Sequence, residues 1–463
     1  GSIPPYERAP RVRPRARANV VAEELGVGWF GIAQIGLVQA AIGALVMLVT
    51  TVLNRVMVVE IGLVAAIPAG LVAWHYAVQL ARPLWGHGSD RGGGRTVWII
   101  GGVAVLGAGA LLATQATILM GSSFVPGFVL AVLSYSLIGA GVGAGGTSAL
   151  AMLASGVSPR RRAAAAAVTW IMMVAGIVAA AFSVGALLKP FSYERLVLVS
   201  GGLALAMLAL TVLATFRLER QAGRYGHAAE GGEAPGFKAA IAEIWQEQAA
   251  RRFSVFIFVS MIAFSMQDLI LEPFAGLVFG MEPGESTQLG GQHQGGILIG
   301  MIVAGIGGSA FAGRLPGELR LWVVAGCLGS ALALAALGAA AMHGPGWPLG
   351  INVFVLGFSN GVFAVSAIGA MMGLAGAGRT TREGVRMGVW GASQAIAFGL
   401  GGLLGALGVD IARQIMAHDG SAFRFIFAIE AILFVIAAGL ALRTTGTSAV
   451  PQTGSARDSE VFA

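Results

Sequence analysis

The sequence is poor in charged residues and nearly free of cysteine. Asp, Glu, Lys and Arg make up 11% of its 463 residues, and Cys327 is the single cysteine. Soluble domains carry about 25% charged residues, so this composition excludes an ordinary soluble protein. One cysteine excludes a disulfide framework and a thiolate metal site. What is abundant is apolar: 56% of the residues are hydrophobic, which indicates an integral membrane protein.

Motifs for catalysis and nucleotide binding are also missing. There is no hydrolytic triad with defined spacing, no carboxylate–histidine metal cluster and no phosphate-binding loop. The segment GVGAGG (141–146) matches GxGxxG, but it lies inside an apolar run with no preceding strand, so it predicts close helix packing. The net charge of +7 is explained by the cationic loops of a membrane protein. We therefore expect neither an enzyme, nor a nucleotide-driven pump, nor a nucleic-acid-binding protein.

Twelve apolar stretches approach the roughly 20 residues that a helix needs to span a bilayer. The sequence therefore predicts an all-α membrane protein with twelve transmembrane helices, at 29–53, 63–81, 97–120, 124–154, 163–188, 195–215, 253–280, 295–313, 319–342, 348–375, 385–409 and 422–442.

The distribution of basic residues predicts the orientation of these helices. If the N-terminal arm lies in the cytoplasm, 24 of the 29 Lys and Arg residues fall on the cytoplasmic side. This asymmetry is the one that the positive-inside rule describes. Both termini are therefore expected to be cytoplasmic. The opening Gly1-Ser2 is typical of an expression scar.

A long polar connection divides the twelve stretches into six and six, and matching features recur in the two parts. Trp170 and Trp390, for example, each follow a basic loop and lie 220 residues apart. Two six-helix halves around a central cavity are the arrangement of the major facilitator fold. The expected organisation is a cytoplasmic arm (1–24), a first half (25–215), a cytoplasmic linker with a short surface helix (216–252), a second half (253–442) and a cytoplasmic tail (443–463).

The loop GHGSDRGGGR (86–95) resembles the signature that major facilitator proteins carry after their second helix. The resemblance implies that Asp90 meets basic groups and a helix N-terminus across the interface between the halves. At the equivalent place in the second half, only Arg314 keeps its position. The expected gating loop comprises Gly86, Ser89, Asp90, Arg91, Gly93 and Arg95.

Polar side chains at membrane depth are candidates for a functional site because each must be paired or hydrated. We assign eight of them to the expected cavity: Asn54, Arg55, Glu60, His75, Gln79, Gln267, Asp268 and Glu272.

The expected pairing places Arg55 opposite Asp268 or Glu272. The latter two are four residues apart and share one helical face, and Pro273 is expected to free backbone carbonyls beside them. Arg55 and Glu60 lie about 140° apart on an α-helix, which makes them poor partners for each other. The alternative interpretation is that Arg55 and Glu60 simply reach the outer headgroups.

The histidines are weaker candidates. His75 shares one helical face with Gln79; it either bonds to a neighbouring group or acts as the axial ligand of a chlorin magnesium, and no metal cluster made by the protein itself is expected. His293 is expected in a loop before the eighth helix.

Three stretches together, TTVLNRVMVVE, AWHYAVQLARPLWGHGSDRGGGRTVWIIGG and FSMQDLILEPFAG, resemble the PucC family. This is the bacteriochlorophyll-delivery branch of the major facilitator superfamily, and LhaA is a related member. The resemblance implies a membrane protein that presents bacteriochlorophyll during assembly of light-harvesting antenna complexes. It further implies antenna polypeptides and pigment-synthesis enzymes as partners, in a bacterial inner or intracytoplasmic photosynthetic membrane.

A second interpretation stays open at this point. The chain can also be read as a proton-coupled transporter of small amphiphilic molecules, in which Asp268 or Glu272 carries the proton. An enzyme of pigment synthesis is disfavoured because the sequence lacks an Asp-rich motif for a prenyl diphosphate.

Overall fold

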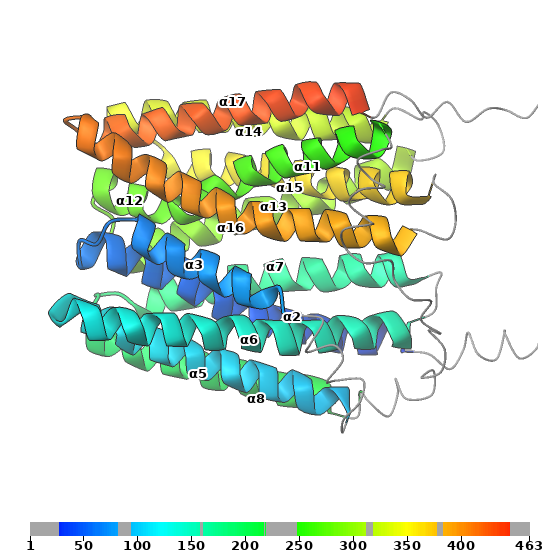
Figure 1. Cartoon of the computed structure of the whole chain (residues 1–463), viewed down its shortest axis with the longest axis horizontal. Coiled ribbons are helices and arrows are strands. Elements are labelled where there is room, and N and C mark those ends of the chain that lie inside the picture. Colours follow the sequence, from blue (N-terminus) through cyan, green and yellow to red (C-terminus); the bar gives the residue numbers. More distant parts are fainter. Residues whose placement is uncertain are drawn as a thin grey trace, which may run out of the picture.

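The computed structural model describes residues 27–81, 94–157, 161–216, 218, 248–311, 318–376 and 383–444, and all the elements in these ranges are helical. The helices run side by side as one elongated bundle (Figure 1). The first helix begins and the last helix ends at the same end of this bundle, which is called the terminal end here. The opposite end is called the far end.

Eight helical segments come from the first part of the chain. They are α2 (Trp29–Met47), η1 (Leu48–Leu53), η2 (Val56–Glu60), α3 (Ala66–Gln79), α5 (Arg95–Ser122), α6 (Phe124–Gly156), α7 (Arg162–Leu187) and α8 (Tyr193–Thr215).

Eight more come from the second part. They are α11 (Gln248–Met266), η4 (Gln267–Leu269), α12 (Leu271–Phe279), α13 (Pro283–Phe311), α14 (Glu318–His343), α15 (Leu349–Gly376), α16 (Glu383–Ile415) and α17 (Asp419–Thr444).

In the described part of the chain, nine helices are long and apolar enough to span a membrane. The bent pair formed by α11 with η4 and by α12 would make a tenth span. The segments α3 and α13 lie in the bundle in the second and eighth positions of the predicted order, but they do not pass the same test. The all-helical membrane fold is confirmed, whereas the count of twelve spans and the cytoplasmic termini stay predictions.

Glycines allow the helices to approach closely. In α5 and α6, Gly102 and Gly141 lie so near each other that a Cβ on either would collide with the backbone of the opposite helix. Gly401 and Gly405 of α16 lie equally close to Ser265 and Met266 at the end of α11. Gly141 of the GxGxxG match therefore packs against a neighbouring helix, as expected. Backbones can approach this closely in a membrane only where side chains are small.

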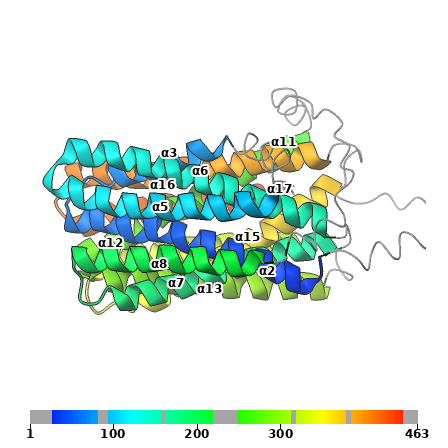
Figure 2. The same cartoon turned by 90° about the horizontal axis from the view of Figure 1, so that it is seen from below.

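The helices form two groups that meet along two seams. Segments α2 to α8 lie on one side and α11 to α17 on the other (Figure 1). Seen from below, α5 and α8 lie in front of the second group (Figure 2). Across the seams α7 packs against α13 and α3 against α16. The exact bounds of the predicted halves, linker and arm remain predictions, because 1–26, 217, 219–247 and 445–463 lie outside the described residues.

Two helix boundaries were predicted wrongly. The first span continues to Glu60 and does not end at 53, because two wider helical segments carry it onward past Asn54 and Arg55. The eighth helix begins at Pro283, twelve residues earlier than expected. Its first turns are polar in sequence, yet Ser286, Thr287 and His293 are buried against other helices, so hydropathy alone underestimated its length.

Candidate polar site between the two groups of helices

Arg55 and Glu60 form an ion pair because the first span is not α-helical at this point. η1 and η2 are π-helical, and a π-helix pairs residues i and i+5 where an α-helix pairs i and i+4. Five residues therefore complete about one turn, and Arg55 Nη1 lies 2.5 Å from Glu60 Oε1. The prediction that these two are poor partners was wrong, since it assumed α-helical geometry.

Arg55 also reaches across to the second group of helices. Its Nη2 donates a hydrogen bond to the carbonyl oxygen of Met281, just beyond Gly280, which ends α12 in a left-handed conformation. A cation is favoured where a helix presents its last carbonyls. The Arg55 side chain is 2% exposed and that of Glu60 30%. Arg55 is thus buried between helices, and its depth in the membrane stays a prediction.

Arg55 forms no direct ion pair with Asp268 or Glu272 in the described part of the structure, contrary to expectation. Its guanidinium is used by Glu60 and the Met281 carbonyl. Glu272 lies near enough for Arg55 to act on it electrostatically. The predicted pairing across the cavity is therefore replaced by a longer-range interaction with one of the two carboxyl groups.

Asn54 donates a hydrogen bond to the backbone at the break in the seventh span. Its Nδ2 donates to the carbonyl oxygen of Leu269 over 2.8 Å, and the side chain is buried. Pro273 has no N–H, so Leu269 lacks the donor that would normally reach its carbonyl from four residues ahead. Pro273 does free a carbonyl, as predicted. The 40° bend itself lies earlier, between Leu269 and Leu271.

Glu272 is enclosed at the meeting point of three helical segments. It is 3% exposed, and Ser286 of α13 lies beside its carboxyl group. A Cβ on Gly290 would collide with its Oε1 and would also touch Thr51 of η1. Neither carboxyl oxygen makes a well-formed hydrogen bond to the described residues. Glycine at 290 therefore leaves room for a polar group that is not fully satisfied by the protein.

Glu430 of α17 belongs to the same region, and sequence reasoning missed it. Its side chain is completely buried, and both of its oxygens lack a hydrogen-bond partner in the described residues. Asp268 lies close enough to interact with it electrostatically. The signal was present in the sequence, because Glu430 is the only charged residue in FIFAIEAILFVIAAGLAL. Gln267, in the same turn as Asp268, is buried with both amide atoms unpartnered among the described residues.

His75 and Gln79 lie on α3 and are both buried. The Nδ1 atom of His75 is 2.5 Å from the carbonyl oxygen of Val72, and its ring lies 4.2 Å from that of Tyr76. Tyr76 in turn approaches Phe398 of α16, across the seam. In the described part of the chain, no hydrogen bond or ion pair joins His75 or Gln79 to Arg55. The Val72 contact matches the interpretation that His75 bonds to a neighbour, and its role as a pigment ligand stays a prediction.

Five residues of the expected gating loop lie outside the described residues: Gly86, Ser89, Asp90, Arg91 and Gly93. Arg95 is described, and its Nη1 donates to the carbonyl oxygen of Ala151 over 3.0 Å.

At the far end, a separate contact closes the seam between α3 and α16. The two carboxyl oxygens of Asp410 accept hydrogen bonds from the backbone N–H groups of Ala65 and Ala66, at 2.9 and 2.7 Å. A carboxylate is favoured at a helix N-terminus, where N–H groups are unpaired. Lys189 makes a second contact across the other seam, to Gln288 of α13 at 3.2 Å.

The second group contains its own polar network and a groove. His293 lies inside α13 and not in a loop; its Nε2 is 3.4 Å from Asn360 Nδ2, and Asn360 accepts from the Ser330 hydroxyl at 2.7 Å. No three His, Cys, Asp or Glu side chains in the described ranges lie together as metal ligands would.

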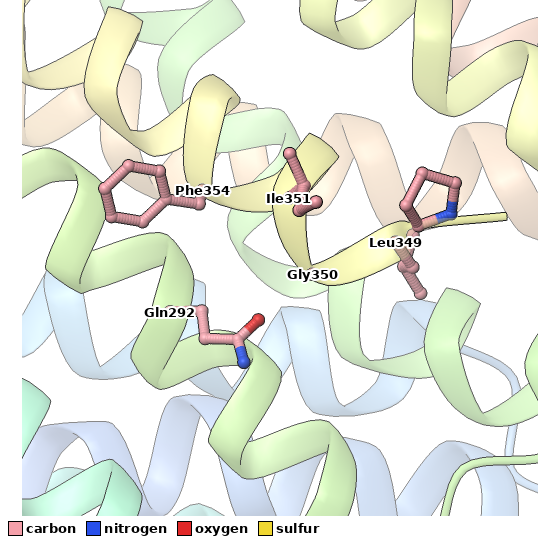
Figure 3. A pocket seen from close by; sticks show the side chains of 6 residues that line it. Gln292, Leu349, Gly350, Ile351 and Phe354 are labelled. Carbon is pink, nitrogen blue, oxygen red and sulfur yellow. The ribbon is translucent and has the colours of Figure 1, made fainter.

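A groove of about 470 Å³ runs between α13 and the start of α15 (Figure 3). It is lined by Gln292, Pro348, Leu349, Gly350, Ile351 and Phe354.

Comparison with solved structures identifies the fold. A peptide transporter POT in complex with alafosfalin superposes with a TM-score of 0.69, at 16% sequence identity, covering 93% of this chain and 98% of the other. A bacterial homologue of the lysosomal transporter Spinster gives 0.64 at 14% identity, covering 91% and 98%. At this identity the likeness shows the fold alone, and that fold is the one of major facilitator transporters.

Sequence comparison identifies the family to which the chain belongs. The family model described as PUCC protein matches residues 52–448. The chain is 49% identical over 437 residues to the bacteriochlorophyll synthase 44.5 kDa chain of Rhodobacter capsulatus, covering 94% of this chain and 99% of that one. It is 28% identical to protein PucC of Cereibacter sphaeroides, covering 86% and 88%. The chain belongs to the PUCC family, as its resemblance predicted.

These findings agree with the expected location. A chain with at least nine apolar spans in its described part and relatives in photosynthetic bacteria is a multi-pass protein of a bacterial membrane.

Proposed function

We propose that this protein binds bacteriochlorophyll in the membrane and delivers it during the assembly of light-harvesting antenna complexes. The observation that carries the proposal is its 49% identity, over nearly the whole of both chains, to a protein named as a bacteriochlorophyll synthase chain. The transporter fold supports delivery over catalysis, since proteins of this fold move a ligand from one side of the membrane to the other or out of the bilayer. Bacteriochlorophyll is here a cargo, and no nucleotide takes part.

The chemistry of the polar site is compatible with such a cargo. A bacteriochlorophyll offers ring carbonyl groups, an ester-linked tail and a magnesium that takes one axial ligand. The region around Asn54 and Glu272 offers an amide oxygen and a carboxyl group that are buried without hydrogen-bond partners among the described residues. A few polar groups in an apolar site fix the orientation of a ligand that is held mainly by its apolar surface. His75 is the proposed candidate for the axial position.

The proposed partners follow from the same function. Antenna polypeptides would receive the pigment, and enzymes of pigment synthesis would supply it. A protein in this role is expected to work in the photosynthetic membrane and to catalyse no reaction of its own.

A second candidate is a proton-coupled transporter of small amphiphilic molecules. It is favoured by the carboxyl groups of Asp268, Glu272 and Glu430, which lie near the break of the seventh span without an ion-pair partner in the described residues. The fold is shared with peptide transporters, which is compatible with either candidate.

Purification from a bacteriochlorophyll-making host distinguishes the two. The expected result is near-infrared absorbance that co-elutes with the tagged protein, together with antenna polypeptides identified by mass spectrometry. The matched control is an unrelated multi-pass protein with the same tag from the same membranes, which should elute without pigment. A colourless protein that takes up small amphiphiles into liposomes along a pH gradient would reject pigment delivery in favour of the second candidate.

A further inference from the structure

Two acidic side chains lie in the region of the break of the seventh span. Asp268 lies in η4. Phe274 of α12 packs 5.0 Å from Phe427 of α17, which places Glu430, one turn further along α17, beside the break and near enough to Asp268 to interact with it electrostatically. Glu430 is completely buried with no hydrogen-bond partner for either oxygen among the described residues, whereas Asp268 is partly exposed. A buried charge without a partner is costly in a membrane protein and by default marks a functional site.

No basic side chain neutralises this pair in the described structure. The elements packed against α17 are α11, α12, α14 and α16. Of these, α12 contributes a third acid, Glu272. The charged residues of α11, α14 and α16 lie in or near the first and last turns of those helices. Arg424, on α17 itself, lies beside Gly338 of α14, and the ion pairs of the described chain use other acids. The charged and titratable groups at those helix ends are Arg251 and Arg252 on α11, Glu318, Arg320 and His343 on α14, and Glu383, Arg386, Asp410 and Arg413 on α16.

We propose that Asp268 and Glu430 form a binding site for a monovalent cation, either a proton or Na⁺, at the break of the seventh span. Two acids that act on each other electrostatically in buried surroundings cannot both stay charged unless a cation lies between them or one of them takes up a proton. Carboxyl oxygens are suitable ligands for a hard cation. Gln267, buried in the same turn with its amide unpartnered in the described residues, offers a further oxygen.

Occupancy of this site would be linked to the shape of the seventh span. Asp268 belongs to the turn that bends by 40°, and the next residue, Leu269, is the one that Asn54 holds. Interrupted membrane helices bind ions at such breaks in other transporters. The cation site does not depend on the proposed function, because it requires no pigment.

Thermal unfolding of the purified full chain in detergent tests the site. For a Na⁺ site, the Tm should rise by several degrees in NaCl relative to choline chloride at equal ionic strength. For a proton site, the Tm should not respond to Na⁺ and should fall as the pH rises. In either case the response should be lost in E430Q and in D268N. The matched control is D419N, which removes an acid at the start of the same helix and should keep the response.

The outcomes are distinct. A Tm that responds to neither Na⁺ nor pH, or a response that E430Q and D268N retain in full, overturns the proposal. Loss of the response in D419N as well overturns it too, since the effect would then be one of general charge. Pigment retention is measured separately, so failure of the cation site leaves the proposed function untouched.

A measurement on the unmodified sequence covers the case in which the variants do not fold. The apolar reagent dicyclohexylcarbodiimide adds to protonated carboxyl groups in apolar surroundings. Cleavage after Arg424 and Arg443 gives a peptide whose only acidic side chain is Glu430, so mass spectrometry reads this site unambiguously. We expect labelling that Na⁺ or a raised pH suppresses. A peptide that stays unlabelled at every pH and Na⁺ concentration contradicts the proposal.

Discussion

The Asn54 side chain occupies the place of a missing backbone donor: its Nδ2 lies 2.8 Å from the carbonyl oxygen of Leu269, which would accept from residue 273 in an unbroken α-helix. Residue 273 is proline and cannot donate. A side chain from the first span thereby completes the hydrogen bonding of the seventh. The same span holds the other end of α12 through Arg55 and Met281, so two adjacent residues fix both ends of one short helix.

Replacing Asn54 by alanine is expected to lower the free energy of unfolding by about 1–3 kcal/mol, because a buried carbonyl loses its donor. P273A returns a backbone N–H that can reach the Leu269 carbonyl. N54A should therefore cost about 1 kcal/mol less in the P273A background. Denaturant titration of the purified protein measures this double-mutant cycle.

The control for this cycle is T50A, which removes a side chain of the same span that bonds only to Val46 of its own helix. Its cost should be the same with and without Pro273. If N54A proved equally costly in both backgrounds, Asn54 would not be substituting for the missing N–H.

A charge reversal at Arg55 should be rescued by a second charge reversal at Glu60. Reversal of the acids of the seventh span should not rescue it. R55E places two acids within one π-helical turn and leaves the Met281 carbonyl without its donor, so it should lose both stability and retained pigment. E60R restores an opposite pair at the observed separation, whereas D268R and E272R do not. Pigment absorbance per protein and Tm are the two measurements. Rescue by E272R exceeding that by E60R would show that the pairing expected from the sequence operates in another state of the protein.

Gly290 should tolerate no side chain while Glu272 is present. G290A places a Cβ against Glu272 Oε1, and overpacking of this kind costs about 1–3 kcal/mol. E272A should recover most of that loss in the G290A background. The matched control is Gly295 in the same helix, around which a Cβ meets no atom within 4 Å. G295A should be neutral or stabilise by up to about 1 kcal/mol, since alanine favours helix over glycine.

A G290A variant as stable as the original protein would mean that Glu272 moves aside freely. Its carboxyl group would then not be held between α12, α13 and the first span.

Much of the fold was readable from the sequence because it depends on composition and on small residues. Apolar length predicted a bundle of membrane helices, and the glycines of 141–146 predicted close packing that Gly102 and Gly141 confirm. These features depend on local side-chain properties that survive in any helical context.

The geometry of the site was harder to predict because it depends on departures from regular helix. Arg55 and Glu60 come together only because the first span becomes π-helical, and no pattern in VLNRVMVVE distinguishes π from α. Pro273 signalled a break in the seventh span, and the bend lies at Ile270, within the turn whose hydrogen bond the proline removes. Glu430 could have been found, since a lone acid in an apolar run is visible without any structure.

Asp410 is expected to keep the far end of the α3–α16 seam closed. D410A removes both acceptors of the Ala65 and Ala66 N–H groups, and loss of a cap of this kind costs about 0.5–2 kcal/mol. Amide hydrogen exchange in the peptide that contains these two residues should accelerate by about 5- to 30-fold for 1–2 kcal/mol. D410N keeps one oxygen acceptor and should give a smaller increase. D419N, whose acid pairs with Arg413 at the same end, should leave exchange at Ala65 and Ala66 unchanged. Unaltered exchange in D410A would mean that the bonds to Asp410 do not protect these N–H groups and that Asp410 does not hold the seam.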